Sequence, residues 1–391
     1  SVADAQRIFH VAEIITKTYQ QGNSVCVVLS AQGDTTDDLI EKAREINPDA
    51  SRREMDMLLS CGEQMSIALM AMAIEKLGFP VVSLCAWQIG MATDSNHSAA
   101  HITKVDCERV KEELDRKRIV LVAGFQGVDR TGDITTLGRG GSDTTAVALA
   151  VALQADLCQI YTDVDGVYTS DPRIVPEARK LSEITYDEML ELASMGAQVL
   201  HNRSVELAKS YGVQLEVLSS FTGNPGTIVK EVVKKVEKTY ITGVAQDKKI
   251  ARFALVGLED VPGVAYKLFN LLAKDKINVD MIIQSLGHDE RKDIIFTVAD
   301  KDSMACARLL DENKDVLKYD HMDINTGVSK VSIVGAGMLE NAGVAAKMFE
   351  ALYQAHINIH MISTSEIKVS VLIDKEDSDR AVRVIHNIFF Q

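Results

Sequence analysis

The strongest chemical signal in the sequence is a glycine-rich stretch, TTLGRGGSDTTAVALA, from Thr135 to Ala150. Glycine lets a backbone turn tightly and approach a ligand, and Ser142 and Asp143 stand where a helix should begin. A helix N-terminus offers free N–H groups and a positive dipole end to a carboxylate or phosphate. Arg139 adds a fork that can bind a carboxylate through two hydrogen bonds, which favours an anion-binding loop over an ordinary capped loop.

A second turn with polar side chains, SAQGDTTDDL, begins at Ser30 directly after the apolar run SVCVVLSA. Its hydroxyls at Ser30, Thr35 and Thr36 could hold a polar substrate, because open parallel sheets place their ligands at the carboxyl ends of strands. A capped helix start, with Asp34 or Thr35 as the cap, explains the same residues. The residues alone leave both interpretations open.

Glu63 lies in LLSCGEQMSIALMAMAI, a helical pattern whose other positions are almost all apolar. A carboxylate in such surroundings needs a partner, because an unpaired buried charge is costly. The ammonium group of a substrate is one candidate. A structural arginine or lysine is the other, and the sequence alone slightly favours it.

The segment YTDVDGVYTSDPRIV, from Tyr161, leaves an apolar run and turns through glycine and proline. It carries groups suited to a nucleotide and its Mg²⁺, namely Tyr168, Asp163, Asp165, Asp171 and Arg173. Turn formation alone also explains its Asp, Gly and Pro residues. The sequence lacks GxxxxGK followed by Ser or Thr, and lacks the HRD and DFG motifs, so neither a P-loop enzyme nor a protein kinase is supported. Its histidines form no metal-binding pattern, and we predict no dedicated metal site.

These motifs must be positioned by an α/β domain, since the first 235 or so residues alternate β-branched runs with amphipathic patterns. A largely parallel sheet is expected. The predicted strands are SVCVVLSA, PVVSLCA, RIVLVAGF, LCQIYTDV and LEVLSS. The predicted helices cover residues 53–77, 144–154, 185–195 and 202–211.

An internal repeat with an offset of 80 residues follows this domain. The segment VPGVAYKLFNLLAKDKINVDMIIQS, from Val261, aligns with NAGVAAKMFEALYQAHINIHMISTS, from Asn341. Each copy predicts a βαββαβ unit, and the two copies are expected to pack together. The predicted domains are residues 1–235, 248–325 and 326–391, the last with an optional strand at 240–246.

Composition narrows the function classes. A formal net charge of −14 over 391 residues argues against general binding of nucleic acid or anionic membranes. The longest apolar stretch, residues 67–74, is well short of the roughly 20 residues of a membrane span, and no signal peptide is recognised at the start. The six cysteines lack any CxxC spacing, which predicts reduced thiols in a cytoplasmic protein.

The motifs GEQ, FQG, TTLGRGGSDTTA, YTDVDGVYTSDPR and the doubled segment ending in STSEIKVSVLI occur in one order, and together they resemble the aspartate kinase family over essentially the whole chain. The resemblance implies an amino acid kinase fold followed by two ferredoxin-like ACT domains. It implies phosphorylation of the side-chain carboxylate of L-aspartate by MgATP, which gives 4-phospho-L-aspartate, the first step of lysine, threonine and methionine biosynthesis. It also implies feedback regulation by lysine, threonine or both, and a homo-oligomer, at least a dimer, that forms through the ACT domains.

The same resemblance assigns roles to individual residues. Arg139 and Glu63 match the positions that bind the carboxylate and the ammonium group of aspartate. The rest of the substrate pocket matches Ser30, Thr36, Gly140, Gly141 and Ser142. Catalytic roles fall to Asp143, Arg139 and Ser142. ATP matches Thr162, Asp163, Tyr168, Asp171, Pro172 and Arg173.

For the effector amino acid, the resemblance implies two related sets of residues. The first copy contributes Asp260, Val264, Ala265, Asn278, Val279, Asp280 and Gln284. The second contributes Val344, Ala345, Asn358, Ile359, Ser365 and Glu366. Simple packing between the two domains is the alternative explanation for these positions.

Two departures from the family pattern bear on catalysis. The family normally opens with a strand reading KFGGTS, whose lysine stabilises charge on the transferred phosphoryl group, and this sequence opens at SVADAQRI. We expect that strand to precede Ser1 in the full protein; a catalytically silent regulatory subunit is the alternative. Gln198 stands where some relatives carry a lysine that contacts ATP. An acetylglutamate-phosphorylating enzyme of the same fold would not need the doubled C-terminal sensor.

Overall fold

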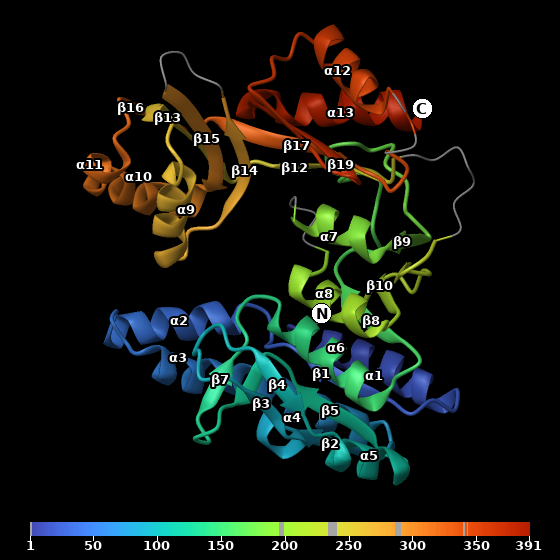
Figure 1. Ribbon diagram of the computed structural model, residues 1–391. Helices are drawn as coiled ribbons and strands as arrows, with labels where there is room; N and C mark the ends of the chain where they lie inside the picture. Colours follow the sequence, from blue (N-terminus) through green and yellow to red (C-terminus); the bar gives the residue numbers. More distant parts are fainter. Residues whose placement is uncertain (1, 195–198, 234–240, 286–290, 339–340, 342) are drawn as a thin grey trace. The chain divides into compact units, whose positions relative to one another are not determined.

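The computed structural model describes residues 2–194, 199–233, 241–285, 291–338, 341 and 343–391 (Figure 1). It divides into two compact units. Unit 1 comprises Ser1–Val167, Lys180–Ala193 and Gln198–Lys234, and unit 2 comprises Tyr168–Arg179, Ser194–Ala197 and Lys235–Gln391. The departure noted at Gln198 lies outside the described residues.

Unit 1 is centred on a parallel sheet of order β1-β5-β2, formed by Cys26–Leu29, Ile119–Ala123 and Val81–Leu84. Every residue of β5 is buried, as expected of a continuous apolar run in a central parallel strand. Alternate β5 side chains face α1 (Ala5–Gln20) and α4 (Cys61–Lys76) on one side, and α5 (Glu108–Asp115) and α6 (Gly141–Leu153) on the other. The expected α/β fold class is therefore confirmed.

Two further sheets complete unit 1. One has the order β8-β10-β11-β9, with strands Cys158–Thr162, Leu215–Ser219, Thr227–Lys230 and Glu183–Thr185. The other has the order β4-β3-β6-β7, with strands Ile102–Val105, Met91–Thr93, Gln126–Val128 and Ile134–Thr136. The remaining helices are α2 (Thr35–Ile46), α3 (Arg52–Leu59), η1 (Ala86–Ile89), α7 (Tyr186–Ser194) and α8 (Asn202–Tyr211).

The first copy of the repeat in unit 2 forms a four-stranded antiparallel sheet of order β14-β15-β13-β16. Its chain order is β13 (Ile250–Glu259), α9 (Val264–Lys274), β14 (Val279–Gln284), β15 (Arg291–Ala299), η2 (Asp300–Asp302), α10 (Ser303–Glu312), α11 (Lys314–Leu317) and β16 (His321–Asn325). Phe253 and Phe296 stack at 5.5 Å in its core. This is the βαββαβ topology that the repeat predicts.

The second copy borrows its fourth strand from outside the repeat. Its own elements are β17 (Val328–Val334), α12 (Val344–Gln354), β18 (Met361–Thr364), β19 (Lys368–Asp374), η3 (Lys375–Asp377) and α13 (Ser378–Phe390). The sheet order is β12-β17-β19-β18, and β12 (Gly243–Asp247) precedes the whole first copy in the chain. Gly263 and Gly343, with φ of 96° and 99°, cap α9 and α12 in the same left-handed conformation, which only glycine adopts readily.

The helical segment Arg52–Lys76, formed by α3 and α4, is 25 residues long and apolar enough to cross a membrane by length and composition. The longest uninterrupted apolar stretch of the sequence, residues 67–74, predicts no membrane span, but the helical segment extends well beyond it. One face of α4 supplies Ile67, Met70 and Ile74 to the core against the parallel sheet. That packing accounts for the apolar residues on the inward face of α4, whereas Met65, Leu69 and Met72 on the same helix are exposed.

A buried carboxylate on α3 joins three segments of unit 1. Asp56 accepts hydrogen bonds from the backbone N–H groups of Ser98, at 2.9 Å, and Thr136, at 2.9 Å. The Thr136 hydroxyl donates a third at 2.7 Å, and His97 Nδ1 lies 3.1 Å away. Since Thr136 ends β7 and leads into the glycine loop, Asp56 fixes the start of that loop.

We predict that Asp56→Ala lowers the free energy of unfolding by about 3 kcal/mol, because it leaves buried N–H groups without an acceptor. Urea denaturation followed by circular dichroism measures the change. Glu54→Ala, an exposed position on the same helix, should change the free energy by less than about 0.5 kcal/mol. Equal effects of the two substitutions would contradict this account of Asp56.

Candidate active site

The candidate site lies at the carboxyl ends of β1 and β5, where an open parallel sheet places its ligands. After β1 the chain turns through Ser30 toward α2, and after β5 it passes through Gly124. The Gly124 N–H donates to the Leu29 carbonyl at 3.0 Å, so the two strand ends lie side by side. The serine- and threonine-rich turn therefore lies at the same sheet edge as the end of β5.

The glycine loop packs closely against this edge. Gly140 caps α6 in a left-handed conformation, with φ of 67°, and a Cβ there would lie 2.3 Å from the His201 side chain. A Cβ on Gly141 would lie 2.8 Å from the Phe125 ring. A Cβ on Gly124 would lie 2.6 Å from Ser142 Oγ, which places Ser142 against the end of β5. The loop thus needs glycine for close approach as well as for its turn.

Two residues that the sequence analysis did not assign hold this loop from α8. Arg203 donates to the backbone carbonyls of Leu137, at 3.0 Å, and Ala100, at 2.8 Å. The backbone N–H of His201 hydrogen-bonds to Asp143. The only sequence signal was the polar LHNRS at a helix start, which an ordinary N-cap explains equally well.

Glu63 lies at the start of α4 with only 3% of its surface exposed. Its Oε1 accepts from the Ala31 N–H at 3.2 Å, so the carboxylate and the turn after β1 come together. Its Oε2 has no hydrogen-bond partner among the described residues. Burial raises the pKa of Glu63 to about 7, although two backbone hydrogen bonds act in the opposite direction. The described structure contains no arginine or lysine that neutralises it.

Asp143, in the first turn of α6, is the second perturbed carboxyl group at this edge. Burial raises its pKa to about 6, and the hydrogen bond from His201 partly offsets that effect. Burial, with a contribution from the Asp143 charge, also raises the pKa of Cys158 in β8 to about 12. Two carboxyl groups with raised pKa values near one strand edge are typical of a functional site.

Arg139 is exposed at the tip of the glycine loop, and it makes no hydrogen bond or ion pair with any described residue. Glu63 contacts the turn after β1, and Ser142 contacts Gly124 after β5. Because β1 and β5 are adjacent, Arg139 and Glu63 belong to segments that meet at one edge. Among the described residues, this edge thus presents a cation and a carboxylate oxygen without partners, which complement the α-carboxylate and α-ammonium groups of an amino acid.

The residues expected to bind nucleotide divide between the two units. Thr162, which ends β8, and Asp163 belong to unit 1, where the Thr162 hydroxyl donates to Asp163 at 2.9 Å. Tyr168, Asp171, Pro172 and Arg173 belong to unit 2. Asp171 is bound by Arg173 through two nitrogens, Nε at 3.0 Å and Nη2 at 2.7 Å.

The segment Tyr168–Arg179 packs onto the second repeat copy. Thr169 Oγ1 lies 2.9 Å from His386 Nε2 of α13, and Val244 of β12 donates to the Thr169 carbonyl at 2.8 Å. Arg383 donates to the Ile174 carbonyl at 3.1 Å, and Val175 is buried in the core of this copy. The Asp, Gly and Pro residues of this segment predict a turn, but they do not indicate that the segment packs onto the second repeat copy.

Four of the expected effector residues are already engaged within unit 2. Asp260 pairs with Lys292 at 2.9 Å, and Asp280 of β14 pairs with the buried Lys330 of β17. Val264 and Val344 are buried in the cores of the first and second copies. The remaining expected positions are partly buried or exposed around the two helix starts and the strands β14 and β18: Ala265, Asn278, Val279, Gln284, Ala345, Asn358, Ile359, Ser365 and Glu366. Sequence reasoning missed Lys292 and Lys330.

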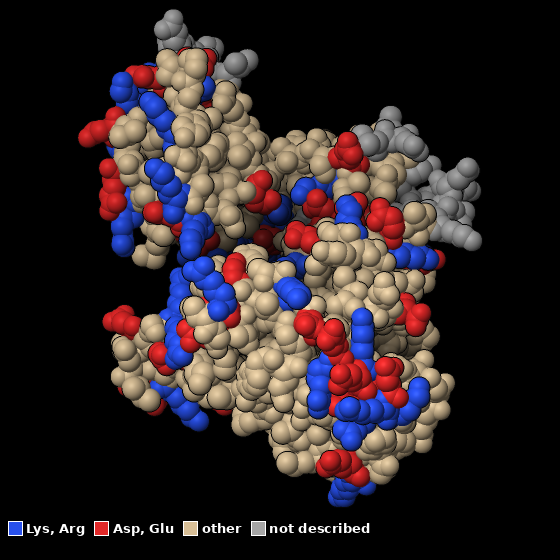
Figure 2. All heavy atoms as spheres, turned by 60° about the horizontal axis from the view of Figure 1, so that its bottom comes forward, with Lys and Arg blue, Asp and Glu red and all other residues tan. Residues whose placement is uncertain are grey.

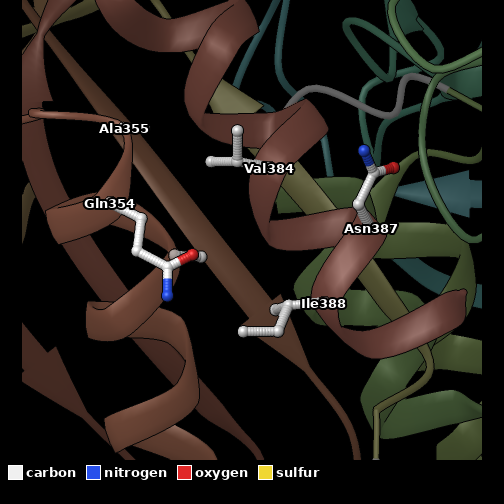
Figure 3. Close-up of a pocket in the computed structure, with 6 residues that line it drawn as sticks. Gln354, Ala355, Val384, Asn387 and Ile388 are labelled. Carbon is white, nitrogen blue, oxygen red and sulfur yellow. The ribbon is translucent and has the colours of Figure 1, made fainter.

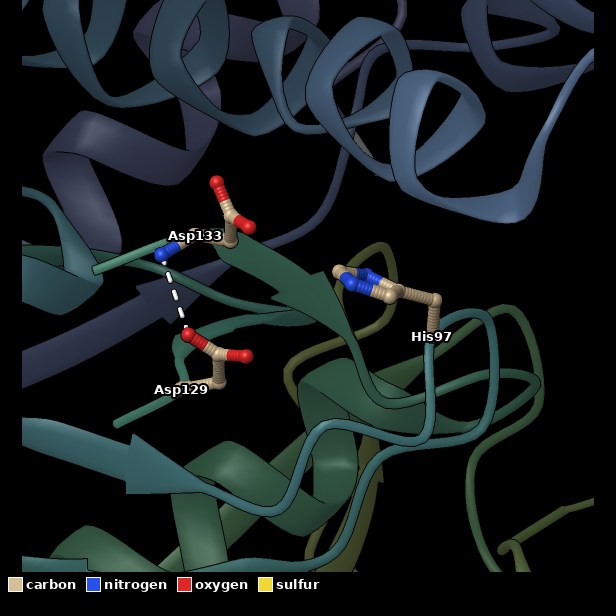
Figure 4. A group of neighbouring side chains, drawn as sticks. All are labelled: His97, Asp129 and Asp133. Atoms are coloured by element: carbon tan, nitrogen blue, oxygen red, sulfur yellow. Dashed lines mark hydrogen bonds between the residues drawn. The ribbon is translucent and has the colours of Figure 1, made fainter. Parts of the chain in front are cut away.

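A group of possible metal ligands, His97, Asp129 and Asp133, lies beside the small sheet, with ligand atoms within 4.8 Å of one another (Figure 4). Each is engaged by the chain itself. Hydrogen bonds from Thr131 and Ser95 hold the pKa of Asp129 far below its usual range. Asp133 pairs with Arg53 at 2.8 Å, and His97 contacts Asp56. These contacts explain the cluster without a metal ion.

Two hollows of the described surface lie away from the residues expected at the site. One, of about 380 Å³, separates α12 from α13 and is lined by Gln354, Ala355, Val384, Asn387 and Ile388, together with Ala351 (Figure 3). The other, of about 280 Å³, lies between α2 and α3. Neither contains Glu63 or Arg139 in its lining.

Comparison with known proteins covers the whole chain. Residues 1–219 match the amino acid kinase family, and residues 253–313 and 331–389 match the ACT domain. An aspartokinase of Bacillus sp. (strain MGA3) is 47% identical over 389 residues, which is 100% of this chain and 95% of the relative. An aspartokinase of Mycolicibacterium smegmatis is 49% identical over 394 residues, with coverage of 100% and 94%.

Solved structures of aspartokinases also match this chain over its whole length. The crystal structure of E. coli aspartokinase III in complex with aspartate and ADP (R-state) matches with a TM-score of 0.84 at 25% identity, covering 100% of this chain and 98% of that one. The structure of the same enzyme in complex with lysine and aspartate (T-state) matches with a TM-score of 0.77, with the same identity and coverage.

We predict that Gly140→Ala destabilises unit 1 by about 3 kcal/mol, because strain at positive φ adds to a clash with His201. The control is Gly132→Ala, whose φ of 87° is equally unfavourable but whose Cβ would meet nothing within 4 Å. That variant should lose only about 1 kcal/mol. Urea denaturation distinguishes the two, and equal losses would show that the loop is not packed as described.

Proposed function

The chain belongs to the aspartokinase family, and from this premise we propose that it transfers the γ-phosphoryl group of ATP to the side-chain carboxylate of L-aspartate. The product is 4-phospho-L-aspartate, the first intermediate toward lysine, threonine and methionine. One observation carries the proposal beyond family membership. Among the described residues, a buried carboxylate oxygen on Glu63 has no donor and the exposed Arg139 has no acceptor, and both belong to segments that meet at one sheet edge.

Aspartate supplies both missing partners. Its ammonium group binds Glu63, and the ion pair relieves the cost of the unpaired oxygen. Its α-carboxylate binds Arg139 through two hydrogen bonds. Ser30 and Thr36, in the turn held by Glu63, and the loop residues Gly140, Gly141 and Ser142 complete the pocket. The arrangement holds aspartate by its α-ammonium and α-carboxylate groups. Its side-chain carboxylate is left free to react.

Phosphoryl transfer then depends on positioning and electrostatics. A carboxylate oxygen of aspartate attacks the γ-phosphorus in line, and no covalent enzyme intermediate is needed. The N–H groups at the start of α6 face developing negative charge, and Asp143 orients the groups at the transfer centre.

Mg²⁺ neutralises phosphate charge when bound, and Mg²⁺ prefers carboxylate and phosphate oxygens. The half-buried Asp143 carboxylate, with the Thr162–Asp163 pair at the end of β8, offers oxygen ligands of that kind. In unit 2 the nucleotide residues are Tyr168, Asp171, Pro172 and Arg173. Asp171 is oriented by Arg173 and is therefore the less available of the acids.

Regulation by lysine, threonine or both belongs to the two ACT domains, which we assign to residues 248–325 and 326–391 after a kinase domain of residues 1–235. The first-turn N–H groups of α9 and α12 suit an effector's carboxylate. An ammonium group of the effector would compete with Lys292 for Asp260 and with Lys330 for Asp280. Because Tyr168–Arg179 packs onto α13 and β12, an effector that shifts the second copy shifts nucleotide residues with it. Coupling of about 1 to 3 kcal/mol is the usual range.

The enzyme acts in the cytoplasm as a homo-oligomer. Ferredoxin-like sheets leave strand edges that pair readily in symmetric assemblies.

We predict that the protein releases ADP from ATP with L-aspartate at least 100-fold faster than with L-glutamate, because Glu63 and Arg139 fix the α-ammonium and α-carboxylate groups of the acceptor at one distance from the phosphorus. A coupled ADP assay measures both rates. Adding lysine, threonine or both should lower the rate. Equal rates with the two acceptors would refute the substrate, and indifference to both effectors would refute only the regulatory part.

The KM for aspartate should rise about tenfold as the pH falls from 8 to 6, because Glu63 has a pKa of about 7 and only its deprotonated form pairs with an ammonium group. Initial rates across this range give the profile. Glu63→Gln should raise the KM at pH 8 about 100-fold and remove its pH dependence, whereas Glu75→Gln, exposed on the same helix, should change neither. A profile that persists in Glu63→Gln would assign it to another group.

A further inference from the structure

The chain makes a strained turn shortly after the central strand β5. Phe125 has a φ of 68°, and the N–H of Gln126 donates to the Gly124 carbonyl at 2.8 Å. A hydrogen bond across three residues, with positive φ at the middle one, defines the rarer and strained of the two γ-turn types. For a bulky side chain this backbone conformation is an outlier. Such strain persists only where the surrounding structure holds it, and it concentrates at functional sites.

Chain reversal alone does not account for this strain. Five of the seven non-glycine residues with positive φ in the described part of the chain lie just after a helix, where the conformation is common: Lys117, Gln154, Lys276, Lys318 and His356. Phe125 follows a strand instead, and glycine would adopt its φ at no steric cost. Gly124 and Gly127 flank it for another reason, since a Cβ would lie 2.6 Å from Ser142 Oγ and 2.3 Å from Thr93. A phenylalanine between two glycines indicates that the ring itself is needed.

Phe125 contacts the glycine loop on both sides of Arg139. Its carbonyl accepts from the Leu137 N–H at 2.8 Å, before the loop, and its N–H donates to Thr145 Oγ1 at 3.2 Å, after the loop. The Thr145 hydroxyl in turn donates to the Gly141 carbonyl at 3.0 Å. The half-buried ring lies against Gly141, where a Cβ would be 2.8 Å from ring atom Cδ2. One residue therefore holds both ends of the segment that carries Arg139.

We propose that Phe125 is a positioning residue for the acceptor amino acid, because its γ-turn fixes the glycine loop, and with it Arg139, before the acceptor binds. This positioning role rests on the proposed binding of aspartate by Arg139 and Glu63. The γ-turn is also tied to the other half of the acceptor site, since the Gly124 N–H donates to the Leu29 carbonyl, at the start of the turn that Glu63 contacts. A loop ordered beforehand loses less conformational entropy on binding, so these contacts favour affinity for the acceptor.

A glycine substitution tests the role of the ring. Phe125→Gly keeps both backbone hydrogen bonds and relieves the strain, but it removes the ring contact with Gly141. The KM for aspartate should rise about tenfold, and the KM for ATP should stay within about twofold, because the contacts of Phe125 reach the glycine loop and not the expected nucleotide residues. Steady-state ADP release at varied aspartate and varied ATP gives both constants. An equal rise in the two constants, or no rise for aspartate, would overturn the proposal.

Lys117→Gly is the matched control for strain relief. Lys117 has a φ of 58° and is exposed just after α5, where charged side chains of both signs gather on the surface of unit 1 (Figures 1 and 2). The substitution relieves the same backbone conformation without touching the glycine loop. Neither KM should change by more than about twofold. A rise in the KM for aspartate equal to that of Phe125→Gly would contradict a specific role of the ring.

Two neighbouring threonines test the backbone contact. Thr144 and Thr145 are both buried on α6, and each hydroxyl donates to a loop carbonyl at 3.0 Å. Thr145 also accepts from the Phe125 N–H. Thr145→Val should therefore raise the KM for aspartate about tenfold, whereas Thr144→Val should change it by less than about twofold. Equal effects of the two valine substitutions would show that Phe125 does not act through Thr145.

Amide hydrogen exchange separates the positioning role from the identity of the substrate. Thr145→Val should speed exchange at residues 137–141 about tenfold, and Thr144→Val should not, because the Leu137 N–H donates to Phe125. Mass spectrometry of peptides from the full protein measures the exchange. Unchanged exchange in Thr145→Val would overturn the proposal whatever the acceptor. Faster exchange, in a protein that releases no ADP with aspartate, would refute the substrate and leave the fixed loop in place.

Discussion

A buried carboxylate must be given hydrogen-bond donors, and this requirement organises unit 1. Asp56 and Glu63 lie on the same helical segment, and both are nearly inaccessible to solvent. Asp56 is surrounded by donors from two other segments, so its charge is stabilised within the fold and fixes the strand that leads into the glycine loop. Within the part of the chain that the structure describes, Glu63 has one donor from outside its own helix and one oxygen without a partner. The first carboxylate is therefore structural, and the second is prepared for a ligand that arrives with its own donor.

The fold brings this free oxygen to the glycine loop through ordinary packing. Two parallel strands end side by side, and each is followed by a turn. One turn is held by Glu63, and the other lies under the first turn of α6, where glycines without side chains let the loop approach Phe125 and His201. Arg203 then fixes the loop through the Leu137 carbonyl and ties it to the segment before β4 through the Ala100 carbonyl. Most of the site's precision thus comes from backbone contacts, which tolerate little change in side-chain volume.

Local patterns in the sequence predicted much of this arrangement. The glycine stretch does begin a helix, the β-branched runs form the parallel sheet, and the repeat folds twice with the same capped turn. Features set by contacts between distant segments were missed. The lysines that pair with Asp260 and Asp280 lie in other strands, and the expected nucleotide segment gave no sign that it packs onto the C-terminal helix. For Glu63 the sequence predicts a partner and slightly favours a structural arginine or lysine, which the described residues do not supply. Periodicity indicates that a residue is buried and not what surrounds it.

The position of β12 has a consequence during synthesis. This strand leaves the ribosome before the first ACT domain, yet its partner β17 follows about 90 residues later, on the order of ten seconds at bacterial elongation rates. The first copy can complete its own sheet in that interval, while the edge of β12 that pairs with β17 stays open. The second copy therefore folds last, around a strand made first, and a nascent chain that stalls in between exposes an open edge to its neighbours.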